Sequence, residues 1–139
     1  MQIISIINQK GGVGKTTSAI NLAAGLSQQN KKILVIDLDP QGNATTGLGL
    51  SNIDNSSETI YGVLNGTKEI NDVIKKTQFE NLDIITSNVD LSGLEVETAD
   101  DSNRAFLLKV KLTAYLNNSG GIYDYILIDC PPSLSLLTV

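Results

Sequence analysis

The feature that most constrains this chain is a glycine-rich run at residues 10–17, which reads Lys-Gly-Gly-Val-Gly-Lys-Thr-Thr. An apolar segment at 3–7 precedes the run and a helical pattern follows it, and a phosphate-binding loop requires this context of strand, loop and helix. Glycine reaches backbone angles that other residues avoid, so main-chain N–H groups can gather around an anion. The first turn of the following helix adds unpaired N–H donors and the positive end of the helix dipole. The run therefore predicts a loop that surrounds phosphate groups.

The polar side chains of this loop suit a nucleotide with a divalent ion. Lys15 supplies a positive charge for the outer phosphates, and Thr17 can donate to an inner one. Thr16 offers a hydroxyl to Mg²⁺, because this ion prefers a few oxygen ligands together with phosphate and water. A glycine-rich turn with a chance lysine is the alternative, and the flanking pattern disfavours it. The predicted nucleotide-binding residues are Lys10, Gly11, Gly12, Val13, Gly14, Lys15, Thr16 and Thr17.

Lys10 departs from the usual form of this loop. A strict pattern has glycine where Gln9 stands, and it has no lysine at the front of the loop. The Lys10 side chain could fold back on its own nucleotide, point to solvent, or reach the nucleotide of a partner subunit. The residues alone leave these three possibilities open.

Three carboxylates follow apolar segments and are candidates for chemistry: Asp37, Asp39 and Asp129. Residues two apart on an extended chain point to the same side, so Asp37 and Asp39 could both face the site. The chain has no histidine, so acid–base chemistry would use carboxylates, lysines or water. Phosphoryl transfer requires mainly positioning and charge neutralisation, which these groups can supply.

Strand-like and helix-like segments alternate along the chain, with residues 41–57 reading as a loop that contains a short helical turn. The first helix places Ala19, Leu22, Ala23 and Leu26 on one apolar face and ends at Asn30. The expected strands are 2–7, 33–38, 82–86 and 125–128, and the expected later helices are 59–64, 70–76 and about 102–117.

This alternation predicts an α/β fold with a mainly parallel sheet and helices on both faces, in a Rossmann-like arrangement of three layers. Ligands of such sheets lie at the carboxyl ends of the strands, where the glycine-rich loop and the three carboxylates are placed. A length of 139 residues suits a single domain, without an internal repeat or linker.

Composition excludes several classes of function. Ten Lys and Arg residues against fifteen Asp and Glu residues give a net charge of −5, which offers no basic patch for nucleic acid. No run of eighteen apolar residues predicts a membrane span, and the N-terminus lacks the pattern of a secretion signal. The single cysteine, Cys130, cannot form an internal disulfide and reads as a small buried residue.

Three segments together resemble the ParA/Soj family of chromosome- and plasmid-partitioning ATPases. They are Asn-Gln-Lys-Gly-Gly-Val-Gly-Lys-Thr-Thr at 8–17, Asp-Leu-Asp-Pro-Gln-Gly-Asn at 37–43, and Ile-Asp-Cys-Pro-Pro-Ser at 128–133. The resemblance implies a P-loop NTPase domain with a deviant Walker A loop, which binds ATP and Mg²⁺ and hydrolyses ATP. It also implies that ATP binding and homodimer formation are one event, and that the intact protein is cytoplasmic and associated with the nucleoid.

The resemblance also implies roles for individual residues. Lys10 contacts the nucleotide of the other subunit, and Lys15 acts on the phosphates of its own. Asp39 orients the attacking water and Asp37 supports the magnesium shell, although the reverse division stays open. Asp129 holds magnesium through a coordinated water, with a strand-end cap as the alternative. The implied catalytic residues are thus Lys10, Lys15 and Asp39, and the implied metal residues are Thr16, Asp37 and Asp129.

The implied partners are a second copy of the chain and a centromere-binding ParB-type protein. Family members bind DNA nonspecifically through basic residues that mostly follow position 139, so DNA contact is not expected through this segment. Because members continue for about as many residues again, residues 1–139 are expected to be the N-terminal portion of one truncated ATPase domain. The resemblance also implies that the strand ending at Asp129 lies beside the first strand, with later strands on the other side. Truncation is then expected to leave a long apolar edge exposed.

Four alternatives come from other classes. A MinD-like positioning ATPase usually has glycine at position 9 and needs a C-terminal amphipathic membrane helix. An iron–sulfur reductase on the same fold needs two cysteines per subunit, and Cys130 stands alone. A metabolic ligase or synthetase would show ATP turnover that depends on a second substrate. The chain could also be a nucleotide-binding fragment that neither hydrolyses ATP nor binds DNA.

Overall fold

The computed structural model describes residues 2–6, 13–50, 55–88, 90–91, 104–119 and 122–129. Its strands are β1 (Gln2–Ile6), β2 (Ile33–Asp37), β3 (Ile74–Lys76), β4 (Leu82–Ile85) and β5 (Tyr125–Asp129). Its helices are α1 (Val13–Ser27), α2 (Asn43–Gly47), α3 (Ile60–Leu64), α4 (Ile70–Val73) and α6 (Arg104–Ser119), with a 3₁₀ turn η1 at Ser56–Glu58.

The strands form one sheet in the order β1-β5-β2-β4-β3. The pairs β1·β5, β5·β2 and β2·β4 are parallel, and β3 pairs antiparallel with β4. The predicted α/β fold with a mainly parallel sheet is therefore confirmed. The strand that ends at Asp129 lies beside β1, as the family resemblance implied. Ile3 of β1 is 45% exposed at this edge of the described sheet.

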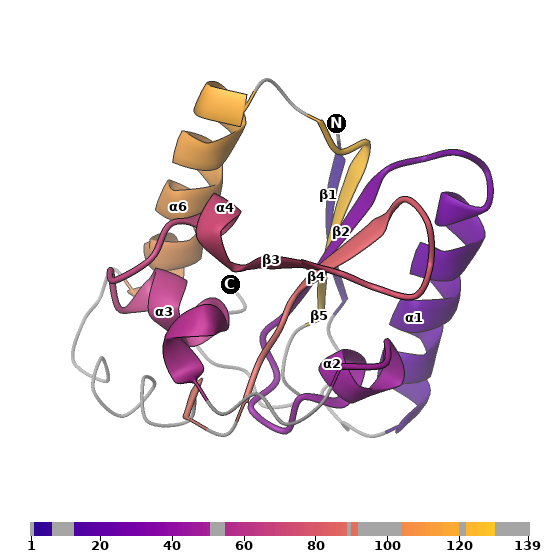
Figure 1. The fold of residues 1–139 in the computed structure, drawn as a ribbon, viewed down its shortest axis with the longest axis horizontal. Coiled ribbons are helices and arrows are strands. Elements are labelled where there is room, and N and C mark those ends of the chain that lie inside the picture. The colour runs from indigo at the N-terminus through magenta and orange to yellow at the C-terminus, as the bar shows by residue number, and fades with distance from the viewer. Residues whose placement is uncertain are drawn as a thin grey trace.

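Helices cover both faces of the sheet, as Figure 1 shows with α3, α4 and α6 on one side and α1 and α2 on the other. The sheet side chains alternate between two apolar clusters, because successive residues of a strand point to opposite faces. Ile33, Val35 and Leu127 lie in the cluster beneath α1 and α2. Leu34 and Ile126 lie in the cluster beneath α3, α4 and α6. Since both faces are covered, the central strands are continuously apolar.

The predicted helix at 70–76 is wrong in its second half. α4 begins with a capping box, in which the Glu69 N–H donates to the Asp72 carboxylate at 3.0 Å, and the helix ends at Val73. Ile74 is extended, with φ −69° and ψ 131°, and β3 pairs its backbone with the open side of β4. Pairing with a neighbouring strand satisfies these backbone groups and overrides a weak local helix preference. The sheet consequently has an antiparallel edge strand that the pattern did not predict.

The buried face of α1 also differs from the prediction. Ala23 is fully buried and Leu26 is half-buried, but Leu22 is 42% exposed. The helix meets the sheet along a narrow stripe, and Leu22 lies about 100° around the helix from Ala23. Ala19 is outside the residues whose side chains are described. The helix is followed by Asn30 at φ 62°, which confirms the predicted left-handed terminator.

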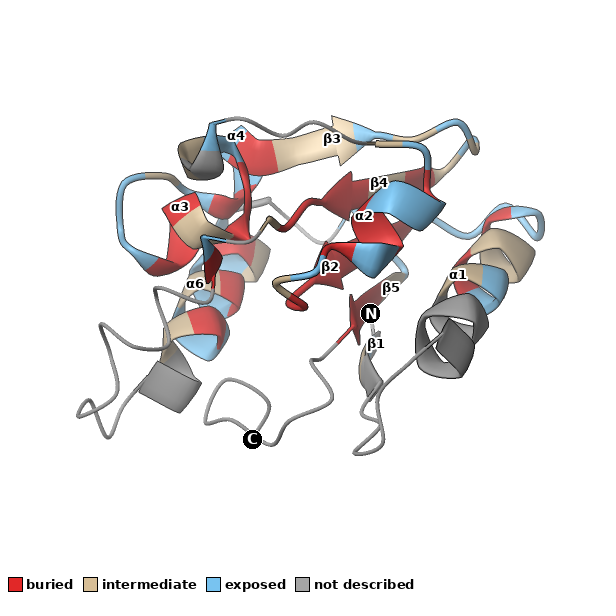
Figure 2. Ribbon diagram, turned by 90° about the horizontal axis from the view of Figure 1, so that it is seen from below, coloured by how far each residue is buried: buried red, intermediate tan, exposed pale blue. Residues whose placement is uncertain are grey.

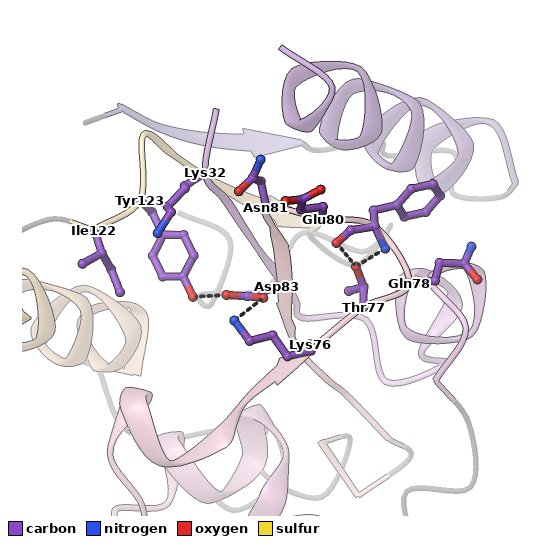
Figure 3. A pocket seen from close by; sticks show the side chains of 10 residues that line it. Lys32, Lys76, Thr77, Gln78, Glu80, Asn81, Asp83, Ile122 and Tyr123 are labelled. Atoms are coloured by element: carbon purple, nitrogen blue, oxygen red, sulfur yellow. Dashed lines mark hydrogen bonds and ion pairs between the residues drawn. The ribbon is translucent and has the colours of Figure 1, made fainter. Parts of the chain in front are cut away.

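The amino ends of the parallel strands are closed by a polar contact on the α6 side of the sheet. The buried Tyr123 hydroxyl donates to the Asp83 carboxylate at 2.7 Å, and Lys76 lies 3.6 Å from the same carboxylate. Burial, and then the hydrogen bond to Asp83, raise the pKa of Tyr123, so the hydroxyl keeps its proton. A cavity of about 480 Å³ adjoins this contact, and Figure 3 shows Lys32, Asn81 and Asp83 among its lining residues.

Replacing Tyr123 with phenylalanine removes this hydrogen bond. Among the described side chains, the Asp83 carboxylate then keeps only its contact with the exposed Lys76. We expect the free energy of unfolding to fall by about 1.5–3 kcal/mol, because the lost bond joins a buried donor to a charged acceptor. Chemical denaturation measures the change. Tyr125→Phe is the matched control, since the Tyr125 hydroxyl donates no bond to Asp83. Equal stability of the two variants would contradict the assigned role of Tyr123.

Candidate functional site

The predicted phosphate-binding loop joins the carboxyl end of β1 to the start of α1. β1 ends at Ile6 and α1 begins at Val13, close to the predicted helix start at Gly14. Lys10, Gly11 and Gly12 lie outside the described residues. The backbone of residues 13–17 forms the first turns of α1, and the side chains of Lys15, Thr16 and Thr17 are outside the described part. Their predicted contacts with a nucleotide therefore stay predictions.

Asp37 and Asp129 end neighbouring central strands at the same level. They are register partners in the β2·β5 pair, and Ile6 of β1 is the partner of Asp129 on the other side. Alternation from Val35 and Leu127 places both carboxylates on the sheet face that α1 and α2 cover. Asp37 is fully buried and Asp129 is 1% exposed. Two acidic residues are thus buried in register at the carboxyl ends of neighbouring strands. Figure 2 shows β2 and β5 coloured as buried.

The Asp37 carboxylate accepts three hydrogen bonds inside the protein. One oxygen accepts from the Asp39 N–H at 3.0 Å. The other accepts from the Thr45 N–H at 2.9 Å and from the Thr45 hydroxyl at 2.7 Å. A carboxylate offers about four acceptor positions, so most of those of Asp37 are used. Asp37 therefore joins the end of β2 to the start of α2.

Burial raises the pKa of the Asp37 carboxyl from 3.8 to about 7. The hydrogen bonds from Thr45 and Asp39 lower the pKa, and the charge of Asp129 raises it further. Desolvation outweighs the hydrogen bonds because it disfavours the charged form of a group with almost no access to water. The pKa of the Asp37 carboxyl is therefore set mainly by how deeply β2 and α2 enclose it.

Asp39 lies beyond the strand in a turn and has different partners from Asp37. Its carboxylate accepts from the Gln41 N–H at 3.0 Å, and its carbonyl oxygen accepts from the Gly42 N–H at 2.8 Å. Gly42 has φ 67°, a left-handed conformation that favours glycine. The chain therefore turns sharply after Asp39, and the two carboxylates that the sequence placed on one side serve different local contacts.

Thr45 and Ser87 belong to this site although the sequence analysis did not select them. The Ser87 N–H donates to the Thr45 hydroxyl at 3.0 Å, and the Ser87 hydroxyl donates to the Asp39 carbonyl oxygen at 2.8 Å. These bonds cross 42 and 48 residues of sequence. Local patterns carry no signal for contacts of this range. The local sequence signal near Thr45 is a glycine, Gly42, followed by a short segment that contains two threonines.

The donor set at this edge fits Mg²⁺. Carboxylate and hydroxyl oxygens are the ligands this ion prefers, and it keeps several waters and phosphate oxygens besides. Among the residues that the structure describes, no group of three or more acidic, cysteine or histidine side chains could hold a metal ion by itself. The buried pair Asp37 and Asp129 would therefore share the ion with the predicted Thr16 and with phosphate.

The Asp37 pKa predicts a dependence of stability on pH in the metal-free protein. The folded pKa of about 7 lies above the ordinary value of 3.8, so between these pH values the folded protein holds a proton that the unfolded chain has lost. The proton on Asp37 therefore favours the folded chain at low pH. This contribution to the free energy of unfolding is lost as pH rises to about 7. A pKa difference of one between the folded and unfolded chains corresponds to about 1.4 kcal/mol, so the total contribution is a few kcal/mol.

Asp37→Asn removes the titration and isolates this effect. The free energy of unfolding of the unsubstituted chain, minus that of the variant, should be larger at pH 5 than at pH 8 and constant above pH 8. Urea denaturation in the presence of a chelator measures both chains. A difference that stays the same between pH 5 and pH 8 would show that Asp37 is ionised in the folded chain throughout this range.

Comparison with known proteins connects this geometry to a family. Residues 1–139 match the AAA domain family. The chain is 50% identical over 133 residues to the chromosome-partitioning ATPase Soj of Treponema pallidum, a match that covers 96% of this chain and 49% of that protein. The chain spans about half the length of the curated relatives it matches.

Two solved structures have the same fold. Cobyrinic acid a,c-diamide synthase from Mycobacterium smegmatis, with bound ATP analog and magnesium, gives a TM-score of 0.87 at 36% identity, covering 99% of this chain and 54% of that chain. A plasmid partition protein from Borrelia burgdorferi gives a TM-score of 0.79 at 37% identity, covering 97% and 58%. The chain belongs to the AAA domain family, and its resemblance to the ParA/Soj partitioning ATPases is confirmed.

Proposed function

We propose that the chain binds ATP with Mg²⁺ at the carboxyl edge of the sheet and acts as an ATPase switch in chromosome or plasmid partitioning. The observation that carries the proposal is the pair of buried carboxylates, Asp37 and Asp129, in register beside the start of α1. Sheets of this kind bind ligands outside the carboxyl ends of their strands. The likeness to a chromosome-partitioning ATPase supports the partitioning role, and the likeness to a synthase with bound ATP analog and magnesium supports the nucleotide and the ion.

In this proposal the loop residues 10–17 hold the phosphates. The backbone N–H groups of Gly11, Gly12, Val13 and Gly14 bind phosphate oxygens, and Lys15 neutralises the outer phosphates. Thr17 donates to an inner phosphate. Thr16 and Asp129 hold magnesium, and Asp37 supports its shell. When bound, the ion neutralises charge on the phosphates during transfer.

Hydrolysis rests on Asp39 and on the two lysines of the loop. Asp39 orients a water molecule towards the outer phosphate, and Lys10 of one subunit reaches the nucleotide of the other. ATP therefore joins two copies, and hydrolysis separates them. Asp39 suits this role better than Asp37, because the described contacts engage the Asp39 carboxylate with one backbone N–H and the Asp37 carboxylate with three donors.

The partners follow from the same assignment. We propose an ATP-dependent homodimer, stimulation by a ParB-type centromere-binding protein, and a cytoplasmic protein that associates with the nucleoid when intact. Nonspecific DNA contact is not assigned to residues 1–139, because their net charge of −5 opposes binding to phosphates. None of the described helices is long and apolar enough to cross a membrane.

A metabolic synthase is the second candidate, because cobyrinic acid a,c-diamide synthase gives a TM-score of 0.87 with this chain. The two candidates differ in what ATP turnover requires. A partitioning switch hydrolyses ATP alone and responds to dimerisation, whereas a synthase needs an acceptor substrate for turnover. Turnover that is negligible until a carboxylic acid substrate and an amide donor are added would favour the synthase.

Isothermal titration with ATP and Mg²⁺, together with sedimentation, tests the first step of the proposal. The chain should bind ATP and shift from monomer to dimer. Lys15→Ala should weaken binding by about tenfold or more, equivalent to at least about 1.4 kcal/mol. Lys10→Ala should bind ATP but stay monomeric. Lys31→Ala, beyond the far end of α1, is the control and should behave as the unsubstituted chain. An unsubstituted chain that binds no ATP would refute the proposal.

Asp39→Ala tests the hydrolysis step. Without an oriented water, the rate of ATP hydrolysis should fall roughly a hundredfold or more, and the ATP-dependent dimer should persist correspondingly longer. Rapid-quench measurement of phosphate release and the dimer lifetime after dilution report the two effects. Asp124→Ala, at the amino ends of the strands, serves as control. A dimer lifetime unchanged by Asp39→Ala would remove Asp39 from the mechanism.

A further inference from the structure

Ser87, the second residue after the end of β4, contacts the turn around Asp39 at more than one point. Its hydroxyl donates to the Asp39 carbonyl oxygen at 2.8 Å, and its N–H donates to the Thr45 hydroxyl at 3.0 Å. Its carbonyl oxygen lies against Gly42, where an added Cβ would approach to 3.2 Å. Ser87 therefore touches the beginning of the turn, its left-handed glycine and the helix that follows.

Thr45 connects these contacts to Asp37. Its hydroxyl donates to the Asp37 carboxylate at 2.7 Å and accepts from the Ser87 N–H, so both functions of the hydroxyl are used. Thr45 and Ser87 are each 3% exposed. Hydrogen bonds in such surroundings are stronger than in water, and the loss of one partner leaves a buried polar group unsatisfied.

The same segment is anchored on its other side. The Thr86 carbonyl oxygen accepts from the Ile60 N–H at 2.9 Å, at the first residue of α3. Thr59 caps that helix, with its hydroxyl accepting from the Tyr61 N–H at 3.2 Å. Residues 86–87 thus lie between the Asp39 turn and the start of α3, and the backbone on each side is fixed to them.

We propose that Thr45 and Ser87 form a latch, named here the Ser87–Thr45 latch, which positions Asp39 for ATP hydrolysis. The inference rests on the proposed ATPase function and adds two positioning residues to it. Both polar groups of the Asp39 backbone are held: its N–H by Asp37, which Thr45 orients, and its carbonyl oxygen by Ser87. The Cα of Asp39 is fixed as a result, and only the side-chain torsions of the carboxylate stay adjustable.

Fixing Asp39 matters because a misplacement of about 1 Å can cost roughly a hundredfold in rate. The described bonds of Ser87 and Thr45 reach Asp37, the Asp39 turn and α2, so the loss of Ser87 should affect the position of Asp39 and the rate of hydrolysis more than ATP affinity. The loss of a hydroxyl with a purely structural role would lower stability, but it would not slow hydrolysis while ATP affinity stayed the same.

Ser87→Ala and Thr45→Val test the latch, with Thr45→Ser as the conservative variant. Their matched controls are Ser27→Ala and Thr77→Val, which remove hydroxyls that bond backbone carbonyls at the far end of α1 and at the amino end of β4. For each chain, titration calorimetry gives ATP affinity and a single-turnover experiment gives the hydrolysis rate. Hydrogen exchange gives the protection of the amides of residues 39–46.

Ser87→Ala should slow hydrolysis by roughly ten- to a hundredfold with ATP affinity within about threefold of the unsubstituted chain. Thr45→Val should slow hydrolysis at least as much, because it also removes a hydrogen bond to Asp37. Exchange at residues 39–46 should become faster in these variants and not in the controls. Thr45→Ser keeps the hydroxyl and should restore both rate and protection.

Two results would overturn the inference and are distinguishable from failure of the proposed function. If the unsubstituted chain hydrolyses ATP and the latch variants do so equally fast, the positioning role is wrong while the ATPase assignment stands. If exchange at residues 39–46 is the same in Ser87→Ala and Ser27→Ala, the latch does not hold the turn. A chain that binds ATP without hydrolysing it refutes the ATPase assignment and the positioning role together, and exchange still decides whether the latch exists.

Discussion

The carboxyl edge of this sheet depends on one buried carboxylate, that of Asp37. It ends the central strand β2, has no access to water, and receives donors from the Asp39 turn and from α2. A buried charge of this kind is costly unless hydrogen bonds satisfy it, and burial raises the pKa of Asp37 in spite of these bonds. The turn and the helix are therefore placed by the need to satisfy Asp37, and Asp39 and Gly42 take their positions from it.

The carboxylates at the two ends of the strands are satisfied by different kinds of donor. At the amino ends, Asp83 is satisfied by the side chains of Tyr123 and Lys76, which close that end of the sheet. At the carboxyl ends, the Asp37 carboxylate accepts from two backbone N–H groups and from the Thr45 hydroxyl. These backbone donors come from the Asp39 turn and from the short helix α2, whereas the Tyr123 ring lies in the apolar cluster beside α6. The carboxyl end is thus the end at which a bound nucleotide could alter structure.

Much of the fold could be predicted from the sequence because its signals are local. Continuous apolar runs identified β2 and β5, and the left-handed Asn30 was expected from its place after an amphipathic helix. β3 escaped prediction because Ile74 to Lys76 is short and continues a helical pattern, and its strand conformation comes from the open side of β4. Leu22 was misplaced because periodicity locates an apolar stripe but not the width of its contact with the sheet.

The site divides in the same way between local and long-range information. Motif spacing placed Asp37 and Asp129 at the carboxyl edge, and the parallel register brings them level on adjacent strands. Spacing could not assign different roles to Asp37 and Asp39, because that difference arises from Thr45 and Ser87, which reach the turn from another helix and from the end of another strand. A carboxylate held by three internal donors is suited to fixing the chain around it. A carboxylate in a turn whose backbone is held at both ends is suited to acting on a ligand, and this contrast supports the roles proposed for Asp37 and Asp39.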